Sequence, residues 1–212
     1  MAKAIVMFSG GLDSRVVIKI LKNMNIEFEA VFFALPFGCG TLNCLKSNVE
    51  FLKKENVKFH IKDCTKEPLF SDYMEIIKNP KYGRGASMNP CKDCKIFILK
   101  KSGELMKKIK ADFIVTGEVL GERPFSQYKS AMMLIEKQAG LEGLVVRILS
   151  GKKLPATIPE KNDIIKREDL LDIEGRYRKR QINLAKEFKI EFPSPAGGCL
   201  LCEKNYTRKL RD

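Results

Sequence analysis

Short apolar runs alternate along the chain with amphipathic segments of helical spacing. The first run, residues 3–8, has the length and composition of a buried strand, and apolar residues then recur every three or four positions over residues 13–24, which predicts a helix. Four more strands are expected at residues 27–35, 57–61, 113–116 and 143–148. Further helices are expected at residues 43–54, 70–78, 91–109, 126–139 and 173–188.

This alternation of strands and helices predicts a parallel sheet with right-handed crossovers. We therefore expect an α/β fold, a doubly wound parallel sheet with helices on both faces and a helical segment at the C-terminus. Beyond residue 150 the pattern changes to two prolines and a charged stretch. The expected organisation is an α/β domain over residues 1–150, followed by a helical extension over residues 151–212 that returns a Cys-x-x-Cys pair to the active site.

The turn between the first strand and the first helix reads Ser-Gly-Gly-Leu-Asp-Ser, residues 9–14. Gly10 and Gly11 allow a sharp turn and a close approach to an anion, and the following helix N-terminus favours phosphate. Ser9 and Ser14 add hydroxyl donors, and Asp13 is suited to hold a Mg²⁺ ion that contacts the phosphates. The pattern of a kinase or GTPase loop, G-x-x-x-x-G-K-[ST], is absent from the sequence.

Net charge and cysteine content narrow the class of protein. The chain of 212 residues carries a net charge of +13, which favours polyanionic partners such as RNA. Basic residues crowd two of the expected helices and are candidates to follow a tRNA backbone: Lys100, Lys101, Lys107, Lys108, Lys110, Arg176, Arg178, Lys179 and Arg180. We find no signal peptide and no membrane-spanning run, so we expect a cytoplasmic protein in which the seven cysteines bind metal or act in catalysis.

Two Cys-x-x-Cys pairs stand far apart in the sequence, at Cys91 and Cys94 and at Cys199 and Cys202. Such pairs are typical of metal sites, because each pair can bind one ion from a single turn. The first pair opens a helix, whose N-terminus should lower the thiol pKa. Three interpretations remain open: structural zinc, a redox or persulfide-carrying pair, and an iron–sulfur cluster held by three cysteines.

The loop resembles that of the N-type ATP pyrophosphatases, or PP-loop family, which cleave ATP between the α and β phosphates to adenylate a substrate. Three further stretches resemble the tRNA thiolation branch of that family, which includes 4-thiouridine synthetases and tRNA 2-thiouridylases. They are Asn89-Pro90-Cys91-Lys92-Asp93-Cys94-Lys95, Val115-Thr116-Gly117-Glu118 and Pro195-Ala196-Gly197-Gly198-Cys199-Leu200-Leu201. The similarity extends from residue 3 to about residue 203.

This resemblance implies an ATP-dependent tRNA sulfurtransferase. It places Phe32 and Phe33 beside adenine and gives Cys91, Cys94 and Cys199 to a 4Fe–4S cluster, with zinc as the alternative. The position of Thr116 and Gly117 after a strand independently marks them for the nucleotide. The candidate catalytic residues are Asp13, Cys91, Cys199 and Cys202.

Several points stay open at the level of sequence. Cys202 could be a fourth metal ligand, a sulfur carrier or idle, and Cys39 and Cys44 could relay sulfur from a glycine-rich loop. The expected partners are tRNA and a sulfur donor, either free sulfide or a carrier protein, and a homodimer is possible. The alternatives are sulfur transfer to a small molecule or cofactor, and a non-catalytic zinc-stabilised RNA-binding module.

Overall fold

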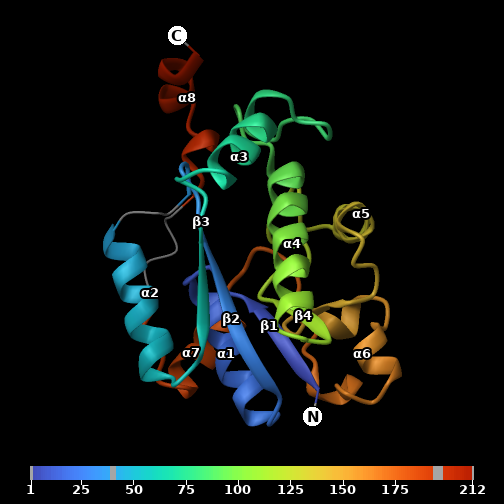
Figure 1. The fold of residues 1–212 in the computed structure, drawn as a ribbon. Helices are drawn as coiled ribbons and strands as arrows, with labels where there is room; N and C mark the ends of the chain where they lie inside the picture. The colour runs from blue at the N-terminus through green and yellow to red at the C-terminus, as the bar shows by residue number, and fades with distance from the viewer. Residues whose placement is uncertain (1, 39–41, 193–197, 212) are drawn as a thin grey trace.

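A computed structural model describes residues 2–38, 42–192 and 198–211 of the chain. Five parallel strands form one sheet in the order β3-β2-β1-β4-β5 (Figure 1), which confirms the predicted α/β class. The strands are β1 (Lys3–Met7), β2 (Glu27–Ala34), β3 (Phe59–Asp63), β4 (Phe113–Thr116) and β5 (Val145–Arg147). Because β2 and β4 flank β1, the direction of strand addition reverses between β1 and β4.

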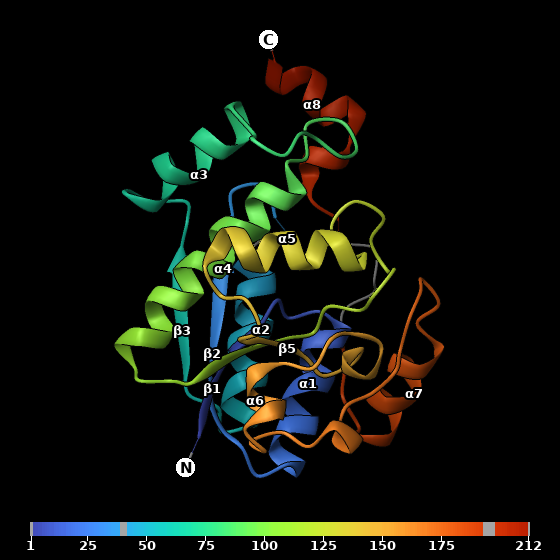
Figure 2. The ribbon, with the colours of Figure 1, turned by 90° about the vertical axis from the view of Figure 1, so that its right-hand side faces the viewer.

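Helices cover both faces of the sheet (Figures 1 and 2). One face packs into a core with α1 (Leu12–Asn23), α2 (Leu42–Lys54) and α7 (Lys179–Glu187). The other face packs against α4 (Cys91–Lys108) and α5 (Lys129–Ala139). The inner strands β1 and β4 read as apolar runs because both of their faces are buried, whereas the edge strand β3 is only partly buried.

A third apolar cluster lies beyond the carboxyl ends of the strands, near the top of Figure 1. It joins α3 (Leu69–Lys78), the start of α4 and the 3₁₀ helix Leu200–Cys202, and α8 (Lys204–Arg211) follows directly. Leu201 is fully buried at its centre. The C-terminal segment therefore returns to the sheet edge at which ligands of parallel α/β proteins bind.

Three predicted elements differ from the structure. The strand expected at residues 57–61 begins at Phe59, since Asn56 (φ of 51°) and the Val57 amide complete the end of α2. The helix expected from residue 126 begins at Lys129. The helix expected over residues 173–188 begins only at Lys179, because Gly175 has a φ of 88° and its amide donates to Leu120 O.

Residues 151–175 wrap around the sheet through α6 (Ile158–Lys161) and the 3₁₀ helices Gly151–Lys153 and Arg167–Asp169. They add Ile165, Leu170 and Ile173 to the same core as α1, and the domain boundary near residue 150 stays a prediction. None of the described helices is long and apolar enough to cross a membrane.

Candidate active site

A cavity of about 680 Å³ opens at the carboxyl ends of the strands, beside the reversal between β1 and β4. Open parallel sheets bind their ligands at this place, and the volume falls within the range of small-molecule sites. All nine residues assigned to the nucleotide from the sequence line it: Ser9, Gly10, Gly11, Asp13, Ser14, Phe32, Phe33, Thr116 and Gly117.

Two glycines set the shape of the nucleotide loop. Gly10 has a φ of 80°, and a Cβ atom there would lie 1.8 Å from Asn48 Oδ1. A Cβ atom at Gly117 would lie 3.0 Å from the backbone of Asp13 and Ser14. The loop therefore packs against both α2 and the end of β4. No side chain caps α1, so its first amide groups are available to an anion.

Asp13 is the buried acidic group of this cavity. Burial, and secondly the charge of Glu122, raises the pKa of Asp13 to about 6. Its Oδ1 atom is buried and has no hydrogen-bond partner within the described residues. An unpartnered carboxylate oxygen beside an anion-binding loop suits a hard cation such as Mg²⁺, whose charge would offset both causes of the raised pKa.

Arg15, a cation in the first turn of α1, stabilises the nucleotide loop. Its Nε donates to Gly10 O at 2.9 Å and one terminal nitrogen donates to Glu191 O at 2.9 Å. The guanidinium also lies 4.6 Å from the centroid of the Phe51 ring. A cation near a helix N-terminus opposes the helix dipole. These contacts, and not a bound phosphate, offset that cost.

The end of β2 carries backbone groups that face the cavity and have no partner within the described residues. Phe8 N donates to Val31 O, the last such contact between the two chain segments, and residues of β2 alternate in the direction that their backbone groups face. Phe33 therefore directs its N–H and C=O beyond the end of β1. Such a donor and acceptor on one residue suit the edge of a purine.

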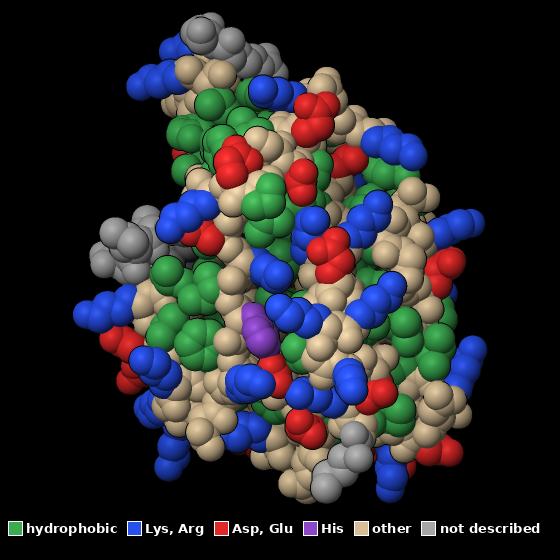
Figure 3. All heavy atoms as spheres, viewed as in Figure 1, with side chains coloured by type: hydrophobic (Ala, Val, Ile, Leu, Met, Phe, Trp, Pro, Cys, Tyr) green, Lys and Arg blue, Asp and Glu red, His purple; other side chains and the backbone are tan. Residues whose placement is uncertain are grey.

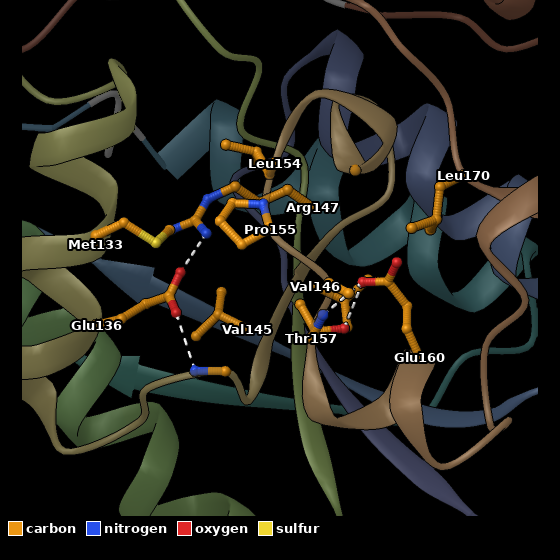
Figure 4. A pocket seen from close by; sticks show the side chains of 13 residues that line it. Met133, Glu136, Val145, Val146, Arg147, Leu154, Pro155, Thr157, Glu160 and Leu170 are labelled. Atoms are coloured by element: carbon orange, nitrogen blue, oxygen red, sulfur yellow. Dashed lines mark hydrogen bonds and ion pairs between the residues drawn. The ribbon is translucent and has the colours of Figure 1, made fainter.

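A buried ionic network forms another wall of the cavity. Glu118 pairs with Lys95 from α4 and, at 3.0 Å, with Arg147 from β5. Burial alone would raise the pKa of Glu118, but the two cations outweigh it and hold the value at about 2. Arg147 also pairs with Glu136 of α5, which accepts a bond from the Gly143 amide (Figure 4). Arg147 thus separates this cavity from a smaller one of about 130 Å³.

Glu122, Arg123 and Arg178 are among the charged residues of the cavity wall that sequence reasoning did not place there. Glu122 and Arg178 form an ion pair, and both lie near enough to Asp13 to shift its pKa. Arg178 was expected within a helix that follows RNA, but it precedes α7 and lines the cavity; the helix position is wrong, and the contact with RNA stays a prediction. The backbone bond from Gly175 to Leu120 and the ion pair with Glu122 hold this segment there.

Charged side chains elsewhere are dispersed. Figure 3 shows Lys and Arg interspersed with Asp and Glu over the face that carries α4. Lys101 lies 3.6 Å from Asp72 and 3.3 Å from Glu104. This face therefore presents no continuous basic stripe along α4.

The two Cys-x-x-Cys pairs come together beyond the sheet. Cys91 and Cys94 lie in the first turn of α4, whereas Cys199 directly precedes the 3₁₀ helix Leu200–Cys202 and Cys202 ends it. Backbone bonds join the segments, from Met88 N to Leu201 O at 3.0 Å and from Leu200 N to Phe37 O at 2.9 Å. Side-chain bonds join Cys91 to Ser126 Oγ (3.2 Å), Cys94 to Tyr73 Oη (3.5 Å) and Cys202 to Asn89 Nδ2 (2.8 Å).

None of the four thiols lines the cavity, but the segment of the first pair borders it. Cys94 precedes Lys95, and Ser126, which contacts Cys91, precedes Gln127; both Lys95 and Gln127 are lining residues. Cys39 and the side chain of Cys44 lie outside the part of the chain that the structure describes, as do residues 195–197 of the C-terminal motif.

Burial raises the pKa of two of the four thiols. It raises the pKa of Cys94 to about 12 and that of Cys199 to about 11. The expectation that the helix N-terminus lowers the thiol pKa is therefore wrong for Cys94. Within residues 2–38, 42–192 and 198–211, no three acidic, His or Cys side chains are arranged to hold a metal ion. Four converging thiols still have the donor chemistry of zinc or an iron–sulfur cluster, so the metal stays a prediction.

No family model matches the chain, and no curated protein matches its sequence. Among solved structures, a glutamine-dependent NAD⁺ synthetase from Acinetobacter baumannii matches with a TM-score of 0.50 and 13% identity, over 97% of this chain and 31% of that one. At this identity the match shows a shared fold.

Two further structures match with a TM-score of 0.49 each. One is the U34-tRNA thiolase NcsA from Methanococcus maripaludis with its 4Fe–4S cluster, 19% identical over 98% of this chain. The other is a predicted subunit of tRNA methyltransferase from Methanocaldococcus jannaschii, 14% identical over 92% of this chain and 94% of that one. The chain spans 65% of the length of the thiolase.

Proposed function

We propose that this protein is an ATP-dependent tRNA sulfurtransferase, which adenylates a uridine carbonyl oxygen and replaces that oxygen with sulfur. One observation carries the proposal: the cavity that the nucleotide loop lines is also lined by Lys95, the residue after Cys94, and by Gln127, the residue after the Ser126 that contacts Cys91. ATP activation and sulfur chemistry are therefore available to one bound substrate.

Adenylation is the first step. The carbonyl oxygen of the base attacks the α phosphorus of ATP, the bond to the bridging oxygen breaks, and pyrophosphate leaves into the loop of Gly10 and Gly11. Asp13 is the residue that would hold Mg²⁺, which neutralises phosphate charge when bound. Arg123 and Arg178 stand on the same wall and supply further positive charge. Positioning and charge neutralisation account for catalysis of such a step.

Displacement of AMP is the second step. A hydrosulfide ion adds to the activated carbon, a C–S bond forms, the C–O bond breaks, and AMP leaves with the oxygen while the sulfur loses its proton. A persulfide on Cys91, Cys199 or Cys202 is the alternative donor, with a second thiol closing a disulfide as the sulfur is released. Free sulfide or a carrier protein would supply the sulfur.

A metal centre would be held by Cys91, Cys94 and Cys199, with Cys202 as a possible fourth ligand. An iron–sulfur cluster would bind sulfide, whereas zinc would fix the two segments together. Either metal requires thiolates, so binding must release the protons that burial now holds on Cys94 and Cys199.

The test is anaerobic incubation of the protein with ATP, Mg²⁺, sulfide and unmodified tRNA, followed by mass analysis of the nucleosides. The expected products are a thionucleoside, AMP and pyrophosphate. AMP formed on a small acceptor instead would favour sulfur transfer to a small molecule. Colourless protein with stoichiometric zinc and no ATP turnover would point to a non-catalytic RNA-binding module; absorption near ~400 nm supports a cluster.

A further inference from the structure

Two segments that are distant in sequence form one edge of the cavity. Leu120 and Glu174 make a parallel bridge, and Gly175 N donates to Leu120 O at 2.7 Å. The ion pair between Glu122 and Arg178 fastens the same two segments a few residues further on. Residues 120–129 lead into α5 and residues 174–178 lead into α7 (Figure 2). We call these two segments together the acceptor rim.

The outer side of the acceptor rim carries exposed aromatic rings among exposed cations. Tyr177 is 87% exposed and Tyr128 is 39% exposed. Exposed cations stand next to them in the sequence: Lys129 and Arg176. Lone exposed aromatic residues are common, but rings interleaved with cations at the mouth of a cavity are the composition of a surface for single-stranded nucleic acid.

On its inner side, the acceptor rim carries a buried side-chain amide whose oxygen lacks a hydrogen-bond donor within the described residues. Gln127 is 9% exposed and lines the cavity, and its Oε1 accepts no hydrogen bond within the described residues. Buried polar atoms are nearly always paired, so such an atom calls for a ligand. The preceding residue, Ser126, is fully buried, and its Oγ atom lies 3.2 Å from Cys91 Sγ. The amide therefore stands between the nucleotide cavity and the thiols.

We propose that the acceptor rim binds an unpaired stretch of RNA, with bases stacked on Tyr128 and Tyr177, and that Gln127 reads the acceptor base. The inference rests on the proposed function and specifies its substrate. Chemistry on a base carbonyl inside a cavity requires a base that has left its stack, and an unpaired base does so most readily. A glutamine amide both accepts and donates, which matches the N–H and adjacent C=O of a uracil-type base.

The first experiment measures binding of an unmodified tRNA transcript by fluorescence anisotropy. Tyr177→Ala and Tyr128→Ala should each weaken binding about fivefold or more, whereas Tyr177→Phe and Tyr128→Phe should retain it, because stacking needs only the ring. Phe70→Ala is the matched control, since Phe70 is 36% exposed on α3, away from the acceptor rim. An RNA duplex of equal length should compete at least tenfold more weakly than an unpaired RNA. Equal competition, or unchanged binding by both alanine variants, overturns the inference.

The second experiment separates Gln127 from general stability. Gln127→Leu should lower kcat/KM for tRNA at least tenfold while the KM for ATP stays unchanged. Gln181→Leu is its control, because the Gln181 amide is also buried without a partner but does not line the cavity. If kcat/KM for tRNA falls equally in both variants, or if Gln127→Leu raises the KM for ATP, the proposal that Gln127 recognises the base is overturned. Failure of the wild-type protein to act on tRNA would instead overturn the proposed function.

Discussion

The nucleotide loop lines the cavity and the first Cys-x-x-Cys pair lies next to it, but the two regions are built in opposite ways. The loop is six consecutive residues, 9–14, fixed by the strand before it, the helix after it and the contact between Gly10 and Asn48. The cysteine region joins residues 91–94 to residues 199–202, more than a hundred positions away, through the backbone bond from Met88 N to Leu201 O and the side-chain bond from Asn89 to Cys202. A locally encoded site depends on the sheet, whereas a non-locally encoded site depends on the docking of the C-terminal segment.

The two regions nevertheless share an electrostatic feature. Burial is the largest cause that raises the pKa of Asp13 to about 6 in one and that of Cys94 to about 12 in the other. Each region therefore holds an acidic group whose charged form the protein alone does not stabilise. A cation at each place would favour the charged form, which connects the expected Mg²⁺ and the expected metal centre to the same physical cause.

The largest effect is expected from Asp13→Asn. Removing the carboxylate removes the ligand for the cation that neutralises the phosphates, so ATP–pyrophosphate exchange should fall about 100-fold or more. The thermal midpoint should hold or rise, because a buried carboxylate without a partner is replaced by a neutral amide. Asp163→Asn is the control: Asp163 is exposed, and its φ of 55° suits asparagine. Exchange at the wild-type rate in Asp13→Asn would remove Asp13 from the mechanism.

The second prediction tests whether the activities of the two regions can be lost separately. Cys199→Ser should abolish thionucleoside formation while leaving ATP–pyrophosphate exchange within about twofold of wild type, because Cys199 does not line the cavity. Mass analysis and the exchange assay measure the two outcomes on one preparation. Cys64→Ser is the control, since Cys64 is buried in the same apolar cluster as Cys94 and Cys199 but belongs to neither pair. Loss of both activities in Cys199→Ser would show that the regions are one cooperative unit.

Glycine substitutions compare the rigidity of the two regions. Gly10→Ala should lower the free energy of unfolding by about 1–3 kcal/mol and weaken ATP binding, because φ is positive and Asn48 occupies the space of a Cβ atom. Gly198→Ala, beside Cys199, should cost less than about 0.5 kcal/mol, since nothing lies within 4 Å of its Cβ position. Urea unfolding monitored by circular dichroism measures both. Equal costs would contradict the contrast between the regions.

The local region is the part that the sequence could predict. Apolar runs located all five strands to within about two residues, because the inner strands of the sheet are buried on both faces and need apolar residues there. The loop of residues 9–14 was predictable for a similar reason, since its glycines and hydroxyls are consecutive. The helix predicted over residues 173–188 was wrong because Gly175 and a bond to Leu120 override its apolar spacing.

Non-local features gave little or no sequence signal. Spacing paired Cys91 with Cys94 and Cys199 with Cys202, but no pattern placed Gln127 or Arg178 on the cavity wall. Their positions follow from contacts across the acceptor rim, which link residues more than fifty positions apart. A buried amide without a partner becomes visible only once burial is known.

The smallest effect tests the residue that connects the two regions. Glu118 follows β4, pairs with Lys95 one position after Cys94, and also pairs with Arg147. Its pKa is about 2 when folded and near ~4.5 when unfolded, so its contribution to stability is complete above about pH 4.5 and is lost as the pH falls towards 2. Glu118→Gln should therefore lower the free energy of unfolding at pH 7 by about 1–3 kcal/mol.

The pH profile distinguishes this charge effect from a change in packing. The unfolding free energies of the wild type and of Glu118→Gln, measured in urea from pH 7 to pH 2.5, should converge as the pH falls, because protonation removes the same charge from the wild type. Glu168→Gln, at an exposed position on the 3₁₀ helix Arg167–Asp169, should stay parallel to the wild type throughout. A constant difference in unfolding free energy between the wild type and Glu118→Gln would mean that the charge of Glu118 does not stabilise the cavity wall between the nucleotide loop and the thiols.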